Sequence, residues 1–125
     1  MYKNILVTLN NSEQDKNLLA HVSELARLTR AHLLLAHVAD GWAARNYDAL
    51  KLAESEEMKA EGLQVSTHLA MGDPPAEILK VAEREGCDLI AMTTHGHRLL
   101  GDIILGSTIE NVRHKSRIPI LVVRG

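Results

Sequence analysis

Short, continuously apolar runs alternate along this chain with longer stretches in which apolar residues recur every three or four positions. The runs predict buried strands, because strands of a parallel sheet are covered on both faces. They lie at residues 5–7, 33–38, 88–92 and 119–123. Residues 65–69 instead alternate between apolar and polar side chains, which predicts a strand with one solvated face at a sheet edge.

The stretches between these runs predict helices. Ser12 and Asp15 have the spacing of a capping box, with Asp in place of Glu, and mark the start of the first helix. One face of this helix carries Leu18, Val22, Leu25, Ala26 and Thr29. Residues 49–60 show a thinner apolar stripe that ends at Gly62, and Asp73 precedes a further helix as its N-cap.

This alternation of strands and helices predicts the fold class. Every connection is long enough for a right-handed strand–helix–strand crossover. We therefore expect an α/β three-layer sandwich, with a five-stranded parallel sheet between helices. The chain has 125 residues and neither a repeat nor a low-complexity linker, which suits one domain over residues 1–125.

Composition narrows the classes of function. Apolar residues make up 46% of the chain but aromatic residues only 2%, so the core must be aliphatic. The net charge of −2 gives no bulk attraction to nucleic acid or to anionic lipid. No apolar run approaches the ~20 residues that span a bilayer. Cys87 is the single cysteine and no signal peptide precedes the first strand, so we expect a cytoplasmic protein.

The stretch from Thr93 to Thr108 has the chemistry of an anion site. It connects the fourth predicted strand to a helix that starts at Gly106-Ser107-Thr108 and ends in a basic segment, 113–115. Glycines let the backbone approach a ligand closely, and the first N–H groups of a helix attract a phosphate without any lysine. A plain strand–loop–helix connection with a serine cap fits the same residues. Both interpretations are open on residue chemistry alone.

Three segments resemble the universal stress protein family. The family's C-terminal signature is similar to THGHRLLGDIILGSTIENVRHKSRIPILVVR. In nucleotide-binding members this signature carries Gly, two residues, Gly, nine residues, then Gly-Ser or Gly-Thr. Gly96 and Gly106 match that spacing, whereas Thr93 stands in place of the first glycine. The family's first strand and helix resemble MYKNILVTLNNSEQDKNLLAHVSELARL, and its third helix and fourth strand resemble AMGDPPAEILKVAEREGCDLIAM.

The resemblance implies a Rossmann-like sheet of order 3-2-1-4-5 and a regulatory stress-response protein that binds an adenine nucleotide, ATP with or without Mg²⁺. That order reverses direction between strands 1 and 4, where ligands of such sheets sit at the carboxyl ends. The implied binding residues are Thr8, Leu9, Asn10, Val38, Thr94, His95, Gly96, His97, Arg98, Gly101, Gly106, Ser107 and Thr108.

Two of these positions leave alternatives open. Asn10 takes the place of an Asp that is typical there, and Val38 takes the place of a residue whose backbone reads the adenine edge. An asparagine held in a turn and a core valine fit the same positions. Asn10 and Thr93 favour an alternative function, a universal stress protein without nucleotide binding that acts only as a dimeric protein-interaction module.

The remaining polar residues predict no metal site. The chain has seven histidines, but no acid–cysteine cluster accompanies His95 and His97, and a structural zinc needs four ligands. His37, inside an apolar strand, predicts a core histidine whose ring is satisfied. Cys87 predicts a small buried side chain rather than a nucleophile, because two neighbouring acids would raise its pKa.

The turn after the first strand excludes two other classes of protein. A phosphoacceptor receiver needs paired acids there, where this chain has Asn10-Asn11. A dinucleotide-binding enzyme needs a glycine-rich turn, and residues 9–12 contain no glycine. No Ser–His–Asp set or carboxylate pair stands out, so we expect no enzyme and no catalytic residue, with weak ATP hydrolysis left open.

The last strand predicts a homodimer. In the order 3-2-1-4-5 it lies at the sheet edge, yet the segment from Ile118 to Arg124 has no charge before its last residue. A long apolar edge invites aggregation unless something covers it, and the same strand of a second copy is the simplest cover. An edge shielded by the chain's own helices is the alternative.

Overall fold

The computed structural model describes residues 1–9, 14–39, 55–93 and 108–124 of the chain. Its strands are β1 (Asn4–Thr8), β2 (His32–Ala39), β3 (Gln64–Met71), β4 (Leu89–Thr93) and β5 (Ile120–Val123). Its helices are α1 (Gln14–Thr29) and α3 (Pro74–Arg84), with shorter helical segments at residues 55–60 and 108–115. Each predicted element is present. The start of the first predicted helix, residues 49–54 of the second, and Gly106 and Ser107 at the predicted start of the last lie outside the described residues.

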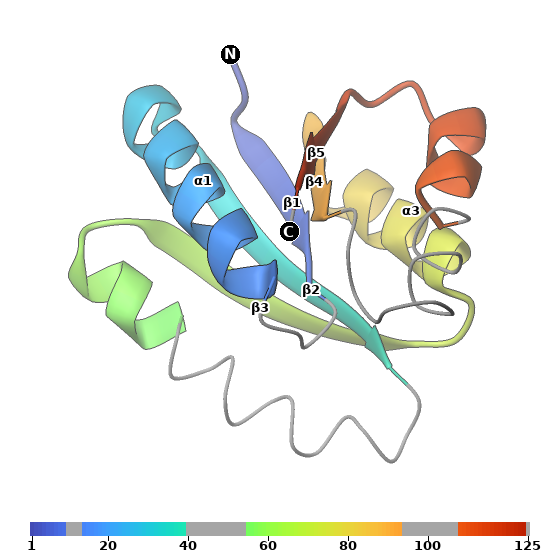
Figure 1. The fold of residues 1–125 in the computed structure, drawn as a ribbon, viewed down its shortest axis with the longest axis horizontal. Helices are drawn as coiled ribbons and strands as arrows, with labels where there is room; N and C mark the ends of the chain where they lie inside the picture. Colours follow the sequence, from blue (N-terminus) through green and yellow to red (C-terminus); the bar gives the residue numbers. More distant parts are fainter. Residues whose placement is uncertain (10–13, 40–54, 94–107, 125) are drawn as a thin grey trace.

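All five strands run parallel in the order β3-β2-β1-β4-β5, which confirms the order that the family resemblance implied (Figure 1). The central strand is β1, which pairs Leu6 with Leu34 of β2 on one side and with Ile90 of β4 on the other. The chain first builds outward from β1 through β2 to β3, and then crosses back to place β4 and β5. The switch of direction therefore lies between β1 and β4.

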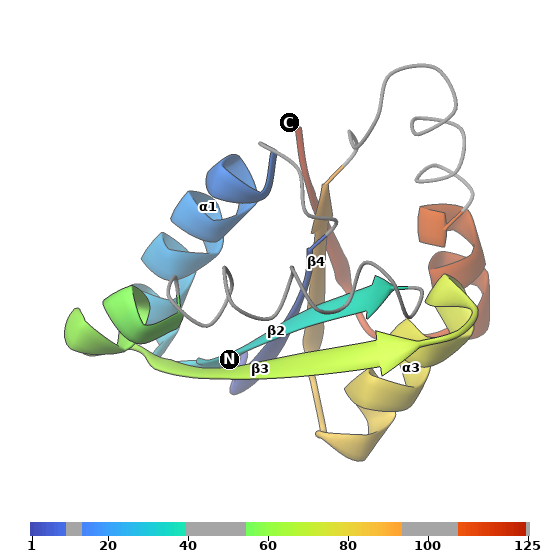
Figure 2. The same cartoon turned by 90° about the horizontal axis from the view of Figure 1, so that it is seen from below.

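Two apolar layers hold the sheet between its helices, because successive side chains of a strand point to opposite faces. Ile5 and Val7 of β1 pack with Leu18 of α1 in one layer. Leu6 packs on the other face with Ile78 of α3 and with residues of segment 108–115. Figure 2 shows α1 and segment 55–60 on one side of the sheet and α3 and segment 108–115 on the other. The predicted three-layer α/β sandwich is confirmed.

Asp88 ties the amino ends of β1 and β4 together. Its carboxylate accepts hydrogen bonds from the backbone N–H groups of Lys3 at 2.8 Å and of Asn4 at 3.1 Å. The side-chain amide of Asn4 donates in turn to the carbonyl of Gly86 at 3.3 Å. Gly86 has a φ of +64°, which a residue with a β-carbon adopts at a cost, so the turn from α3 into β4 favours glycine.

β3 lies at the sheet edge, as predicted, but its alternating pattern does not mark its buried face. Val65 is buried in the same apolar cluster as Met58 of segment 55–60. Thr67 is exposed, and Leu69 is 39% exposed and belongs to neither apolar cluster of the described residues. Which side chains of β3 are buried depends on the elements that pack against the strand, and the sequence of the strand alone does not reveal those elements.

Ser55 should be a site at which removing a polar group stabilises the protein. Its hydroxyl is buried and has no hydrogen-bond partner in the part of the chain that the structure describes. A buried hydroxyl without a partner costs ~1–3 kcal/mol, and alanine is the better helix former. We expect Ser55→Ala to raise the free energy of unfolding by about 1 kcal/mol, measured by urea denaturation.

Ser116→Ala is the matched control. The Ser116 hydroxyl accepts a hydrogen bond from the backbone N–H of Ile118 at 3.1 Å, so the same substitution should lower the free energy of unfolding by ~0.5–1.5 kcal/mol. Equal destabilisation by both variants would contradict the assignment of Ser55 as an unsatisfied group.

Candidate functional site

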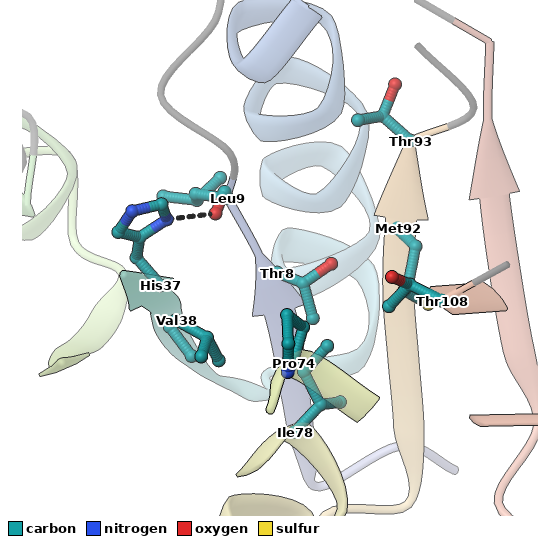
Figure 3. Close-up of a pocket in the computed structure, with 10 residues that line it drawn as sticks. Thr8, Leu9, His37, Val38, Pro74, Ile78, Met92, Thr93 and Thr108 are labelled. Carbon is teal, nitrogen blue, oxygen red and sulfur yellow. Dashed lines mark hydrogen bonds between the residues drawn. The ribbon is translucent and has the colours of Figure 1, made fainter. Parts of the chain in front are cut away.

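A pocket opens at the carboxyl ends of the strands, at the switch point between β1 and β4 (Figure 3). Its volume of about 120 Å³ far exceeds the ~15 Å³ that one water molecule needs, so it has room for a small organic group. The described residues that line it are Thr8, Leu9, Ala36, His37, Val38, Pro74, Ile78, Met92, Thr93 and Thr108. Sheets of this topology bind their ligands at this position.

The end of β1 forms the centre of the pocket and is held from both neighbouring strands. The Thr8 hydroxyl donates to the carbonyl of Ala91 in β4 at 3.3 Å. The backbone N–H of Leu9 donates to the carbonyl of Ala36 in β2 at 2.8 Å. These bonds keep β1 in register with both neighbours up to its last residues, where the pocket begins.

One wall of the pocket is apolar. Val38 comes from β2, Met92 from β4, and Ile78 and Pro74 from α3, so three elements contribute to the same surface (Figure 3). Ile78 and Met92 also belong to the apolar cluster beneath the sheet, and Val38 packs against it. The core itself therefore forms this wall, which suits an uncharged group such as a heterocyclic ring.

The start of α3 is closed to anions although it adjoins the pocket. The first N–H groups of a helix lack partners within the helix and commonly bind phosphates. Here Pro74 and Pro75 have no backbone N–H group to offer. The next two N–H groups are already used: the N–H of Ala76 donates to the Asp73 carboxylate at 3.3 Å, and the N–H of Glu77 donates to the Asp73 carbonyl at 2.9 Å. The predicted N-cap role of Asp73 is thereby confirmed, and its carboxylate would repel a phosphate.

The polar side of the pocket lies at the end of β4 and the start of segment 108–115. Thr93 and Thr108 are both buried, at 3% and 7% exposure, and both line the pocket. The alternation of side chains along β4 places the Thr93 side chain on the same face as Ala91, the α1 side, whereas Thr108 comes from segment 108–115 on the α3 side. Thr108 is also the first described residue of helical segment 108–115, whose predicted start is Gly106-Ser107-Thr108, and the start of a helix favours negative charge.

Comparison with known proteins identifies the family. The model of the universal stress protein family matches residues 1–124. The chain belongs to this family. Universal stress protein MJ0577 of Methanocaldococcus jannaschii is 45% identical over 69 residues, which cover 55% of this chain and 43% of that protein. A universal stress protein of Thermus aquaticus is 31% identical over 137 aligned positions, which cover 99% of this chain and 100% of that protein.

Solved structures agree with this family assignment. The structure of MJ0577 superposes on this universal stress protein with a TM-score of 0.78 at 35% identity and covers 100% of this chain and 97% of that one. UspA of Lactobacillus plantarum reaches a TM-score of 0.82 at 21% identity, with 98% of each chain covered, which supports the fold alone. The fold and the family predicted from the sequence are both confirmed.

The structure brings together four of the residues predicted to bind a nucleotide, Thr8, Leu9, Val38 and Thr108. Outside the described residues lie Asn10, Thr94, His95, Gly96, His97, Arg98, Gly101, Gly106 and Ser107. Lining residues that were not predicted to bind are Ala36, His37, Pro74, Ile78, Met92 and Thr93. The pairing of the strands could have indicated some of these residues. The register places Ala36 opposite Thr8, so the residues at the ends of the strands beside β1 are expected at the same site.

A cluster on β3 resembles a catalytic triad in composition only. The Nε2 atom of His68 lies 3.1 Å from the Ser66 hydroxyl and 4.0 Å from a Glu85 carboxylate oxygen. A triad needs the acid on the other ring nitrogen, where it would orient the base. Burial lowers the pKa of His68, which the carboxylate of Glu85 opposes. This universal stress protein therefore has no nucleophilic triad at this cluster.

The described residues contain neither a metal-binding cluster nor a membrane-spanning helix. Within residues 1–9, 14–39, 55–93 and 108–124, no group of three or more His, Cys, Asp or Glu side chains is placed to hold a metal ion. In those same ranges, none of the helices has both the length and the apolar character needed to cross a membrane. His95 and His97 fall outside these ranges.

Cys87 should resist alkylation in the folded protein. It is buried, and burial, with the carboxylates of Glu85 and Asp88, raises its pKa from 9.0 to about 11. The thiolate is the reactive form, so a rise of this size leaves ~100-fold less of it at pH 8. We expect iodoacetamide to label native Cys87 at least 100-fold more slowly than the urea-unfolded chain, and equal rates would contradict this assignment.

The same shift predicts the pH range in which Cys87 affects stability. The folded protein holds the thiol proton more tightly than the unfolded chain does, so unfolding is favoured once the unfolded thiol ionises. The contribution of Cys87 should be complete below pH 9 and should disappear as the pH rises toward about 11. Cys87→Ser, measured beside the wild type by urea denaturation, should show a smaller loss of stability over that range.

Proposed function

We propose that this universal stress protein binds an adenine nucleotide, with ATP as the first candidate, and acts as a cytoplasmic regulator of the stress response rather than as an enzyme. The proposal depends chiefly on one observation, the pocket at the switch point, whose lining combines an apolar wall with two buried threonines, Thr93 and Thr108. A nucleotide likewise combines an uncharged ring with a charged phosphate end. Family membership supports the regulatory role.

The two sides of the pocket favour one orientation of the nucleotide. The base would lie against Val38, Ile78 and Pro74, because the start of α3 offers no free N–H and carries the Asp73 carboxylate. The phosphates would lie toward Thr93 and Thr108, and the residues that precede Thr108 in the sequence are Gly106 and Ser107. Mg²⁺ could accompany the phosphates on the solvent side.

Two solved proteins of the same fold carry adenine nucleotides. One is a universal stress protein in complex with cAMP, at a TM-score of 0.77 and 22% identity over 98% of this chain and 97% of that one. The other is from Archaeoglobus fulgidus in complex with dAMP, at a TM-score of 0.69 and 22% identity over 97% of each chain. These complexes support the choice of an adenine nucleotide as ligand.

Val38→Phe should weaken nucleotide binding by filling the pocket. Val38 is half-buried and lines the apolar wall, so a phenyl ring there occupies the space that the base needs. We expect the affinity for ATP, measured by calorimetric titration, to fall at least tenfold, which is about 1.4 kcal/mol. The matched control is Thr67→Phe on β3, because threonine has the shape of valine and Thr67 is exposed.

Three outcomes of this titration are distinct. Loss in Val38→Phe with normal affinity in Thr67→Phe supports the proposal. Equal affinity in the wild type and Val38→Phe would place the nucleotide elsewhere. A wild type that binds neither ATP, ADP nor AMP would leave the alternative function, a module that acts only through protein contacts.

We further propose that this protein forms a homodimer through β5. The strand lies at the sheet edge, and Leu121 and Val123 pack against the α1-side core while Val122 is 40% exposed. The Ile90 N–H donates to the Pro119 carbonyl at 3.0 Å. In a parallel ladder, alternate residues of a strand bond to the same neighbour, so the N–H of Leu121 also points toward β4. The N–H groups of Ile120 and Val122 therefore face the open edge, where a second copy could pair antiparallel.

Val122→Pro should split this dimer without unfolding the protomer. Proline removes an N–H that faces the open edge and leaves the β4–β5 ladder intact, a position at which edge strands tolerate proline. Val122→Thr keeps both the N–H and the shape, so it should remain dimeric. Sedimentation should show monomers for Val122→Pro alone, and a dimeric Val122→Pro or a monomeric wild type at micromolar concentration would refute the proposal. Substituting Leu121 or Val123 would instead disturb the core.

A further inference from the structure

The side chain of His37 holds the end of β1 in the pocket. Its Nδ1 atom lies 2.7 Å from the carbonyl oxygen of Leu9 (Figure 3). A carbonyl oxygen can only accept a hydrogen bond, so Nδ1 carries the proton and donates. The sequence pattern predicted a core histidine with a satisfied ring. The ring is satisfied in this way, but His37 is only half-buried and lines the pocket.

This contact completes the attachment of Leu9 to β2. The regular pairing of the two strands ends with Thr8 opposite Ala36. Beyond it, the Leu9 N–H reaches the Ala36 carbonyl at 2.8 Å, and the Leu9 carbonyl receives the His37 ring. Both polar groups of the Leu9 backbone are therefore bonded to β2, one through the main chain and one through a side chain.

The contact between His37 and Leu9 lies in the lining of the pocket. Leu9 directly follows β1, and both it and His37 line the pocket. Without the ring, the Leu9 carbonyl would need another partner, and the peptide that it belongs to could rotate. A rotation there would move the pocket wall at the switch point.

We propose that His37 is a positioning residue for the nucleotide, which acts through the Leu9 carbonyl. This inference depends on the proposed nucleotide binding. The donor at Nδ1 holds the Leu9 peptide in the orientation that the ligand requires.

Three substitutions separate this role from the alternatives. Asparagine places its amide N–H at the position of Nδ1, whereas glutamine places it farther out, near the position of Nε2. Leucine has a similar size and no donor. We expect His37→Asn to keep the ATP affinity within threefold of the wild type, and His37→Gln and His37→Leu to lose at least tenfold, measured by calorimetric titration on variants shown by circular dichroism to be folded.

Each other outcome overturns the inference in a different way. Affinity kept by His37→Gln but lost by His37→Asn would indicate that Nε2 contacts the nucleotide directly. Equal losses in all three variants, in proportion to their free energies of unfolding, would indicate a merely structural role. Normal affinity in His37→Leu would show that the contact is dispensable. A wild type without affinity for ATP would refute the proposed function itself, which the wild-type titration tests separately.

Discussion

The arrangement of this protein depends on the burial of β1 between two parallel neighbours. Ile5, Leu6 and Val7 are all 0% exposed, so the strand supplies side chains to both apolar layers and backbone bonds to both β2 and β4. A strand that is paired on both sides leaves backbone groups unpaired only at its amino and carboxyl ends. Its amino end is held by the Asp88 carboxylate, which leaves its carboxyl end as the place where the sheet can receive a ligand.

The same constraint determines the chemistry of that end. Since side chains alternate between faces, Thr8 shares its face with Leu6 and adjoins the apolar wall of Ile78 and Met92. The wall is an extension of the core, and the two buried threonines, Thr93 and Thr108, lie where β4 and segment 108–115 meet it. A pocket whose lining combines an apolar wall with two buried threonines is thus a consequence of where β1 ends.

The sequence predicted the elements well because long periodic stretches leave few alternatives, as in the helix that buries Leu18, Val22 and Ala26. Strand order could not come from alternation alone and required the family resemblance. The site was predicted only in part. Thr8 and Val38 mark strand ends that the resemblance indicated, whereas Ile78 and His37 reach the pocket through packing and register, which no local pattern encodes. On β3 the predicted edge position is confirmed, but the alternation did not identify the covered face, because Leu69 belongs to neither apolar cluster of the described residues.

The central claim is that an adenine nucleotide occupies the pocket at the end of β1. The most direct measurement is a methyl NMR titration of the wild-type protein with ATP. The claim predicts that shifts concentrate on the methyl groups of Leu9, Val38, Ile78 and Met92, which line the pocket. The methyl groups of Met1 and Leu28 are exposed, do not line the pocket and should not move. Shifts confined to this second set, or none at saturating ATP, would contradict the account.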